Sequence, residues 1–286
     1  MKNIGFVGIG VMGKSMAALL MKAGYHVSVF TRTKAKAASL LEQGAIWKAS
    51  IKELAKTADV IISIVGYPKD VEEIYYGNDG IIENAKQGSC LIDMTTSKPK
   101  LAMQIAETAK QNGLFALDAP VSGGDIGAKN GSLTIMVGGD EKAYEAMLPI
   151  FNVMGTNIVR QGPAGAGQHT KMANQITIAS TMIGVCEAIT YAKKAGLDPT
   201  TVLKSISAGA AGSWSLSNLA PRMMAGDDAP GFYVKHFIKD MTIALESAKE
   251  MDMLSPGLEL SLSLYKQLAE QGEADSGTQA LIKLFQ

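Results

Sequence analysis

Cysteine is scarce in this chain of 286 residues, which has only Cys90 and Cys186, far apart in apolar segments. Two distant thiols of this kind exclude a disulfide framework and a cysteine metal cluster. The three histidines, His26, His169 and His236, are scattered and lack the spacing of metal ligands. We therefore expect no bound metal, and the reduced thiols predict a cytoplasmic protein.

An excess of charge of either sign is also missing, because 27 lysines and arginines balance 27 aspartates and glutamates. Without a broad positive field, neither a nucleic acid nor an anionic membrane surface is expected as a partner. Nowhere do about 18 apolar residues follow one another without a charge, so no membrane span is predicted. The apolar run after Lys2 is rich in glycine and soon meets Lys14, unlike a secretory signal. A small-molecule partner is the remaining expectation.

The first half of the chain alternates short β-rich runs with helix-like segments. The predicted strands are 4–8, 26–30, 59–65, 90–94, 114–118 and 133–139, and the predicted helices are 11–23, 34–43, 68–76, 98–112 and 140–151. Several of these strands are continuously apolar, which is typical of a sheet covered by helices on both faces. The pattern predicts an α/β fold with a doubly wound, Rossmann-type amino-terminal domain.

After residues 160–168 the pattern changes to helical periodicity without a convincing strand. The predicted domains are therefore 1–162, which binds a nucleotide, and 163–286, which is all-helical. The segment 166–194 contains no proline and ends in two lysines, with Gly196 two residues beyond, which predicts one long helix. Asp198 and Pro199 begin another helix, and 216–224, 238–251 and 257–270 are also predicted to be helical.

The segment between the first predicted strand and the first predicted helix consists of Gly8, Ile9, Gly10, Val11, Met12 and Gly13. In a dinucleotide-binding turn, the first glycine permits the turn, the second lets a pyrophosphate approach, and the third allows helix–strand packing. The helix start then offers free N–H groups to the phosphates. A plain structural turn is the alternative, but the setting at the start of an α/β pattern favours dinucleotide binding.

No acidic residue follows the second predicted strand, where NAD-binding proteins carry Asp or Glu for the ribose hydroxyls. The chain has Thr31, Arg32 and Thr33 there instead. A guanidinium group flanked by hydroxyls suits a 2′-phosphate. NADP is therefore the predicted cofactor, with NAD as the alternative. The alternative role for Arg32 is that of an ordinary solvated charge in a loop.

A second group of candidate residues lies at the start of the long predicted helix, in the sequence GAGQHTKMANQ. Asn174 and Gln175 follow Lys171 by three and four residues, so their amides flank the lysine on one helical face. A solvent-facing lysine is the alternative for this residue type.

The sequence DAPVSGG follows a predicted strand, at the edge where open α/β sheets place their ligands. Ser122, Gly123 and Gly124 offer a hydroxyl and approachable backbone N–H groups, which suit a carboxylate. A plain glycine-rich turn is the alternative.

Taken together, these motifs resemble the β-hydroxyacid dehydrogenases of the 3-hydroxyisobutyrate dehydrogenase type, which include tartronate semialdehyde and succinic semialdehyde reductases and are related to 6-phosphogluconate dehydrogenase. Five blocks carry the resemblance in order: 6–17, 93–99, 118–124, 165–175 and 232–241. The resemblance implies a dinucleotide loop over 8–13, a substrate-carboxylate loop over 122–124 and a catalytic lysine at Lys171.

The resemblance also implies that Val65 and Thr96 contact the cofactor, Thr96 near the nicotinamide ribose. Lys239 matches a lysine that closes over cofactor and substrate. Many relatives have asparagine four positions after the catalytic lysine, where this chain has Gln175. We therefore expect Asn174 to take the amide role.

The predicted function is an NADP(H)-dependent oxidoreductase that interconverts a small 3-hydroxy acid and its semialdehyde by hydride transfer, with lysine general acid–base catalysis. A non-catalytic dinucleotide-binding regulatory module and an imine reductase on the same fold are the alternatives. The partner is expected to be a small carboxylate-bearing hydroxy acid or aldehyde. Because the long helix and its neighbours are apolar on too many faces for a monomer, a homodimer or homotetramer is also predicted.

Overall fold

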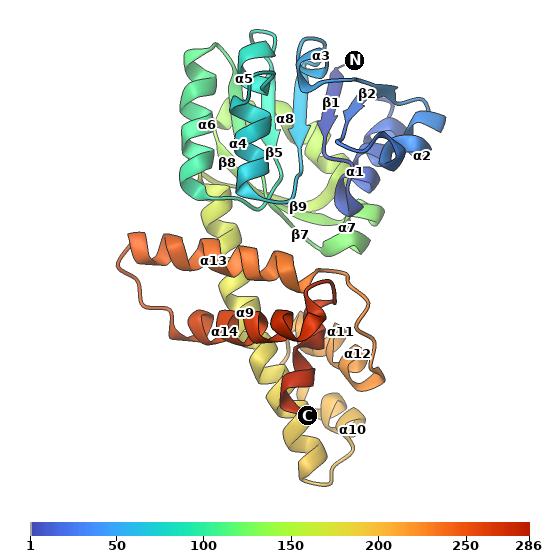
Figure 1. Cartoon of the computed structure of the whole chain (residues 1–286), viewed down its shortest axis with the longest axis vertical. Helices are drawn as coiled ribbons and strands as arrows, with labels where there is room; N and C mark the ends of the chain where they lie inside the picture. Colours follow the sequence, from blue (N-terminus) through green and yellow to red (C-terminus); the bar gives the residue numbers. More distant parts are fainter. Residues whose placement is uncertain (1) are drawn as a thin grey trace. The chain divides into compact units, whose positions relative to one another are not determined.

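The computed structural model describes residues 2–286, which fall into two compact units, one ending at Lys171 and the other beginning at Met172. Figure 1 shows the whole chain. The division lies inside one long helix, α9 (Ala166–Lys194). The predicted domain boundary at residue 162 therefore stays a prediction.

The first unit is built on a nine-stranded sheet with the order β3-β2-β1-β4-β5-β6-β8-β7, and β9 pairs with β8. The six strands from β3 to β6 are parallel to their neighbours, whereas β8 is antiparallel to β6 and β7. The strands are β1 (Asn3–Val7), β2 (His26–Phe30), β3 (Ile46–Trp47), β4 (Val60–Ser63), β5 (Cys90–Asp93), β6 (Phe115–Asp118), β7 (Val121–Ser122), β8 (Leu133–Gly139) and β9 (Gly155–Gly162).

Helices cover both faces of this sheet because successive side chains of a strand point to opposite faces. In β4, Val60 and Ile62 join a core with α1 and α8, whereas Ile61 joins a second core with α4 and α6. The helices of the unit are α1 (Val11–Lys22), η1 (Lys34–Ala37), α2 (Ala38–Glu42), α3 (Ile51–Ala55), α4 (Pro68–Tyr76), α5 (Ile81–Asn84), α6 (Pro99–Gln111), α7 (Gly124–Asn130) and α8 (Glu141–Met154). The prediction of a doubly wound, Rossmann-type unit is confirmed.

Several short or exposed elements were not predicted from the sequence. The largest is β9, an eight-residue strand that pairs with β8 and has four exposed residues and only one buried residue. A mostly solvated edge strand lacks the continuous apolar run by which the other strands were found. The short elements β3, β7, α3, α5 and α7 offer too few residues for a periodic pattern.

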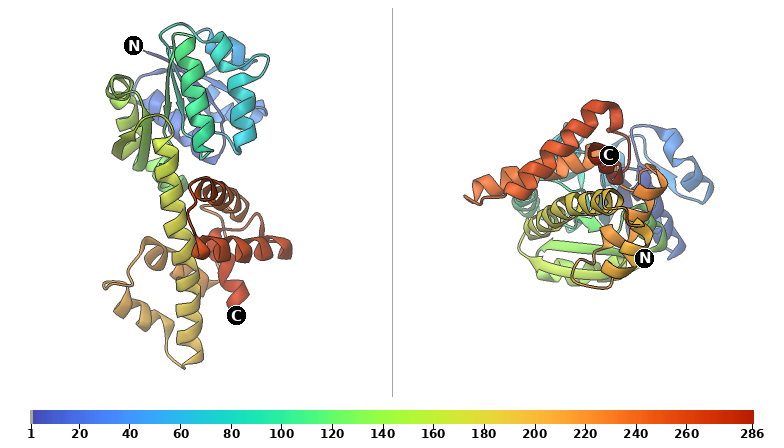
Figure 2. Two further views of the ribbon diagram at one scale, coloured as in Figure 1. Left: turned by 90° about the vertical axis from the view of Figure 1, so that its left-hand side faces the viewer. Right: turned by 90° about the horizontal axis from the view of Figure 1, so that it is seen from below.

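The second unit is helical, and no strand is assigned to any described residue after Gly162. Figure 2 shows α9 as one unbroken helix, as the sequence predicts. Its later turns share an apolar core with α13 and α14. The further elements are α10 (Pro199–Ile206), α11 (Trp214–Asn218), α12 (Ala220–Ala225), α13 (Val234–Glu250), α14 (Pro256–Leu268), the π-helix η2 (Ala269–Glu273) and the 3-10 helix η3 (Thr278–Phe285). The predicted all-helical character is confirmed.

Candidate functional site

The turn from β1 to α1 is packed tightly at two glycines and is open at a third. Gly8 has a φ of 99°, and a Cβ atom there would lie 2.1 Å from the carbonyl oxygen of Ile64. A Cβ atom on Gly13 would lie 2.0 Å from the carbonyl oxygen of Gly8, whereas one on Gly10 would meet no atom within 4 Å. Backbone contacts thus require glycine at positions 8 and 13, and open space lies beside Gly10.

The first turn of α1 is suited to bind an anion. Gly10 precedes the helix without a side-chain cap, and the first turn carries no acidic residue. Its first N–H groups therefore lack intrahelical partners, and the helix dipole is positive at this end. The side chain of Ile9 is in the core, so only its backbone can face a ligand, while Val11 is 61% exposed.

The predicted cofactor and substrate residues of the first unit follow the carboxyl ends of its parallel strands. The chain passes from β1 to β2 on one side and returns to β4 on the other side of β1, so the order of strands reverses there. Open α/β sheets bind ligands at such a reversal. The residues at this edge are Gly8–Gly13 after β1, Thr31–Thr33 after β2, Val65 after β4, Thr96 after β5 and Ser122–Gly124 beyond β6.

Arg32 presents its guanidinium group to solvent, with a side chain that is 80% exposed. Its Nη1 atom lies 3.3 Å from Oδ1 of Asp70. Asp70 also caps α4, because its Oδ2 accepts a hydrogen bond of 3.0 Å from the backbone N–H of Tyr67. An exposed ion pair of this kind is weak, so Arg32 can exchange Asp70 for a stronger anion.

The loop after β5 is held by a buried hydrogen-bond network. The hydroxyl of Thr95 accepts from the backbone N–H of Val65 at 3.0 Å, and the N–H of Thr95 donates to Oδ1 of Asp93 at 3.1 Å. Ser63 also donates to that oxygen, at 2.9 Å. Thr95 is buried, whereas the predicted site residue Thr96 is only half-buried. The network therefore fixes the loop from within.

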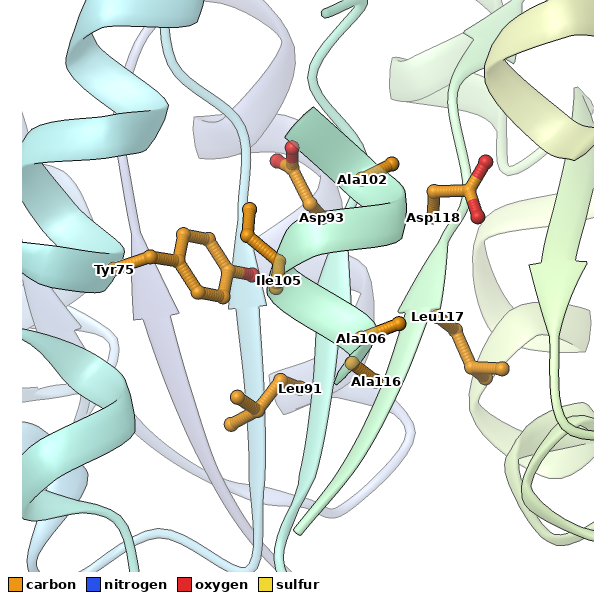
Figure 3. A pocket seen from close by; sticks show the side chains of 9 residues that line it. All are labelled: Tyr75, Leu91, Asp93, Ala102, Ile105, Ala106, Ala116, Leu117 and Asp118. Atoms are coloured by element: carbon orange, nitrogen blue, oxygen red, sulfur yellow. The ribbon is translucent and has the colours of Figure 1, made fainter. Parts of the chain in front are cut away.

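Two buried acidic residues lie on neighbouring strands of the sheet. Asp93 and Asp118 end the neighbouring strands β5 and β6 in matching register, and Figure 3 shows them beside a small cavity that Tyr75 enters from α4. Burial raises the pKa of Asp93 to about 6, against the lowering effect of hydrogen bonds from Thr95 and Ser63. The cavity has room for about one water molecule, so it is an internal feature and not a ligand site.

Ser122 ends β7, which pairs with β8, and two glycines then start α7. Gly123 and Gly124 have φ angles of 125° and 63°, respectively. Such left-handed conformations favour glycine. Ser122 is half-buried and the two glycines are exposed, so the hydroxyl and the backbone are accessible from one side.

Asp118 anchors the start of α9 to the end of β6. Its Oδ1 accepts from the N–H of Gly165 and its Oδ2 from the N–H of Gln168, each at 2.8 Å. These bonds satisfy N–H groups that have no partner within the helix. Burial raises the pKa of Asp118, while the two hydrogen bonds oppose this shift.

Gln168 connects the same helix start to the loop after β5. The side chain is fully buried; its Nε2 donates to the carbonyl oxygen of Thr95 at 2.7 Å, and its Oε1 accepts from the N–H of Ser97 at 2.9 Å. Lys171 follows three residues later in α9 and is only 7% exposed. The lysine is therefore not the solvent-facing charge of the plain interpretation.

In the second unit, the remaining predicted residues form part of a chain of polar contacts between α9 and α13. Nδ2 of Asn174 donates to Oε1 of Gln175 at 2.7 Å, and Nε2 of Gln175 donates to Oδ2 of Asp240 at 2.6 Å. Nζ of Lys239 lies 2.9 Å from Oδ1 of Asp240. Gln175 and Asp240 are each 1% exposed. Gln175 thus links two helices, and the choice of Asn174 for the amide role stays a prediction.

Sequence reasoning assigned no role to several polar residues that hold this arrangement. They are Asp93, Asp118, Gln168 and Asp240. A signal was present for the first two, because each is an acidic residue at the end of an apolar strand. Gln168 and Asp240 carried no such signal, since their partners lie more than sixty residues away in the sequence.

Comparison with known families identifies the two halves of the chain. Residues 3–162 match the family model described as the NAD binding domain of 6-phosphogluconate dehydrogenase. Residues 165–285 match the model described as NAD-binding of NADP-dependent 3-hydroxyisobutyrate dehydrogenase. The chain belongs to the β-hydroxyacid dehydrogenase family. The chain is therefore an NAD(P)-binding member of an oxidoreductase family that acts on hydroxy acids.

Individual relatives match this chain over nearly its whole length. It is 66% identical over 284 residues to the oxidoreductase YkwC of Bacillus subtilis, covering 99% of each chain. It is 35% identical to the 2-hydroxy-3-oxopropionate reductase of Escherichia coli, covering 99% of this chain and 97% of the relative. The structure of 3-hydroxyisobutyrate dehydrogenase from Mycobacterium tuberculosis with L-serine has a TM-score of 0.93 at 29% identity, covering 100% and 99% of the two chains.

One further property concerns membranes. Within residues 2–286, none of the helices combines the length and the apolar character that crossing a bilayer requires.

Proposed function

We propose that this member of the β-hydroxyacid dehydrogenase family uses NADP(H) to interconvert a small 3-hydroxy acid and its semialdehyde, with Lys171 as general acid and base. The observation that carries the proposal is the burial of Lys171, which is 7% exposed. It lies in the first turns of a helix bonded to the ends of β5 and β6. A buried amine at the ligand-binding edge of a sheet is suited to proton transfer and not to solvation.

The residues at this edge fit a dinucleotide. The open space beside Gly10 and the free N–H groups of α1 would hold the pyrophosphate. Arg32, between Thr31 and Thr33, would hold a 2′-phosphate, and Val65 and Thr96 would contact the nicotinamide half. When bound, NADP(H) supplies or accepts the hydride.

The substrate would be held and protonated by the protein's own side chains. Ser122, Gly123 and Gly124 would bind its carboxylate through a hydroxyl and backbone N–H groups. In reduction, the ammonium group of Lys171 donates a proton to the carbonyl oxygen; in oxidation, the neutral amine removes it. Asn174 would orient the substrate hydroxyl and Lys239 would contact substrate and cofactor, so that orientation contributes to the rate.

The test is NADPH oxidation with a panel of small carboxylated aldehydes. Lys171→Met keeps an unbranched side chain only one atom shorter and removes the amine that carries the proton, so kcat should fall about 10³-fold. Lys193→Met is the matched control, because Lys193 is an exposed lysine of the same helix. It should retain the activity of the unmodified protein.

Each other outcome decides against the proposal. Equal turnover by the native protein and Lys171→Met would show that Lys171 is not the acid. Cofactor binding without turnover of any aldehyde would favour a non-catalytic binding module. Turnover of cyclic imines but not of aldehydes would favour imine reduction on the same fold.

We also infer that the protein forms a homodimer or homotetramer through its helical unit. Large apolar side chains of that unit are exposed, among them Tyr191 at 75%, Leu254 at 91% and Leu260 at 54%. Such side chains are commonly covered in assemblies. A single monomeric species in sedimentation velocity would contradict this inference.

The free state of the two thiols is consistent with a reducing compartment. Cys90 and Cys186 are both buried and free, and burial raises the pKa of each thiol to about 12. Such thiols are unreactive. A cytoplasmic location therefore remains our proposal.

A further inference from the structure

Gln168 is a fully buried polar side chain to which the proposed chemistry gives no task. A buried amide is costly unless its donor and acceptor are both bonded. Its donor reaches the carbonyl oxygen of Thr95 at 2.7 Å and its acceptor receives the N–H of Ser97 at 2.9 Å. One side chain therefore makes two opposite bonds to the backbone of a single loop.

These two bonds flank one residue. Thr95 and Ser97 are the neighbours of Thr96, which the proposed function places beside the nicotinamide ribose. The amide of Gln168 donates to the residue before Thr96 and accepts from the residue after it. The two bonds together fix both the position and the orientation of this short backbone segment. A carboxylate could not donate, and an aliphatic side chain could do neither.

The other end of the connection is rigid. Gln168 and Lys171 are three residues apart in the same helix, so their Cα atoms are separated by about 4.5 Å along its axis. The backbone N–H of Gln168 is itself bonded to Asp118. A Cβ atom on the neighbouring Gly167 would lie 2.4 Å from the carbonyl oxygen of Met136. The helix start is thus packed against the sheet without room to shift.

We propose that Gln168 is a positioning residue that fixes Lys171 relative to Thr96. It would thereby hold the amine that transfers the proton at a constant distance from the loop that binds the nicotinamide ribose. The inference rests on the proposed function. Proton and hydride transfer on one substrate require both partners in place at once, and a misplacement of about 1 Å is enough to slow a reaction by about 100-fold. Loss of the connection should therefore reduce the rate more than the binding of either ligand.

Three variants separate this role from simple stability. Gln168→Leu keeps the approximate shape and removes both bonds. Gln168→Glu keeps an acceptor for Ser97 but places a second acceptor against the carbonyl oxygen of Thr95. Gln279→Leu is the matched control, because Gln279 is 1% exposed and its Nε2 donates to the carbonyl oxygens of Asp227 and Ala229 at 2.9 and 3.0 Å.

Steady-state kinetics and isotope effects give the first measurement. In Gln168→Leu, kcat should fall about 10- to 100-fold while the KM for NADPH changes by less than about threefold. The primary isotope effect with 4-deuterated NADPH should rise, because hydride transfer becomes rate-limiting. Gln279→Leu should lower the melting temperature to a similar extent and leave kcat and the isotope effect unchanged.

The glutamate variant gives a rescue. A protonated carboxyl group can donate to the carbonyl oxygen of Thr95 and accept from Ser97, as the amide does. The ratio of the kcat of Gln168→Glu to that of Gln168→Leu should therefore rise as the pH falls from 8 to 5.5. A constant ratio would count against the two-bond role.

Hydrogen exchange tests the connection without any turnover. In Gln168→Leu, the amides of residues 94–98 and 165–171 should lose protection together, and in Gln279→Leu they should keep it. Unchanged protection in these segments, or a kcat equal to that of the native protein, would overturn the inference. If the native protein turns over no substrate, the proposed function fails and with it the positioning role, whereas the exchange result still reports whether the two segments are joined.

Discussion

At the scale of single residues, Gly10 and Gly13 belong to one motif but have different physical reasons to be glycine. Gly13 is enclosed by backbone, whereas a Cβ atom on Gly10 would meet nothing within 4 Å. Gly10→Ala should therefore leave the melting temperature nearly unchanged, yet raise the dissociation constant for NADPH about tenfold, because the methyl group occupies the space left for the pyrophosphate.

Gly13→Ala is the contrasting variant. Its methyl group would be 2.0 Å from the carbonyl oxygen of Gly8, and overpacking of this kind costs about 1–3 kcal/mol. Scanning calorimetry and NADPH fluorescence titration measure the two effects. Equal loss of stability in both variants would contradict the different roles of the two glycines.

Arg32 tests the choice of cofactor at the same scale. Arg32→Ala removes the exposed guanidinium group that Asp70 holds at 3.3 Å. Charge-assisted hydrogen bonds contribute about 1.5–3 kcal/mol, so the dissociation constant for NADPH should rise about 10- to 100-fold.

The control for Arg32 compares cofactors and positions. The dissociation constant for NADH should not change in Arg32→Ala, and Lys36→Ala, which removes a nearby exposed charge, should change neither constant by more than about twofold. Weaker binding of both cofactors to Arg32→Ala would mean that Arg32 does not recognise the 2′-phosphate.

The individual residues also show where sequence reasoning succeeds. Gly10 and Gly13 could be assigned to a dinucleotide-binding turn because the pattern that identifies this turn is local. It consists of a strand, a glycine-rich turn and a helix that follow one another in the sequence. Gln168 could not be assigned, because its meaning depends on Thr95 and Ser97, which are brought to it by the fold. A buried polar side chain has no local pattern that distinguishes it from an exposed one.

At the scale of elements, α9 was predicted with its observed limits, Ala166 and Lys194, because a long stretch without proline between clear end signals is unambiguous. The strand β9 was missed because only one of its eight residues is buried and polar residues interrupt its apolar ones. Periodicity reports which face is buried, so elements with little buried surface escape it. The short helices α3, α5 and α7 were missed for another reason, because each has too few residues to show a periodic pattern.

The start of α9 makes a prediction about Asp118. Asp118→Asn replaces one of two accepting oxygens by an N–H₂ group that faces a backbone N–H. An unsatisfied buried donor costs about 1–3 kcal/mol, so the melting temperature should fall by about 2–10 °C.

Asp140→Asn is the matched control for this element. Asp140 caps α8 through one oxygen, which accepts from Ala143 at 2.9 Å, and asparagine keeps that acceptor. Its melting temperature should stay within about 2 °C of the native value. If Asp118→Asn is no less stable than this control, then Asp118 does not anchor α9.

At the scale of the whole molecule, the division into two units follows from separate cores. Two clusters flank the sheet, and a third lies within the helical unit. The sequence indicated both units because its apolar pattern changes along the chain. In the first part, apolar β-rich runs alternate with helix-like segments, whereas the second part shows helical periodicity alone. The residue at which one unit ends could not be read in this way, since α9 contributes to both without a break in its pattern.

The stability of the whole molecule should depend on pH through Asp93. Burial raises its pKa from 3.8 to about 6, so between these values the folded protein binds more protons than the unfolded chain. The free energy of unfolding therefore falls as the pH rises through this window and levels off above about pH 6. Asp93→Asn cannot ionise and keeps an oxygen for Thr95 and Ser63, so it should escape this loss.

The difference in unfolding free energy between Asp93→Asn and the native protein should thus be near zero at about pH 3 and reach about 2–3 kcal/mol in favour of the variant at pH 7. Asp59→Asn is the control of opposite sign, because its hydrogen bond with Lys86 lowers the pKa of Asp59. That variant should be the less stable one at pH 7 and should approach the native protein as the pH falls below 4. Urea unfolding from pH 3 to 8 measures both curves, and a constant difference for Asp93→Asn would show that its carboxyl group is ionised without cost in the folded protein.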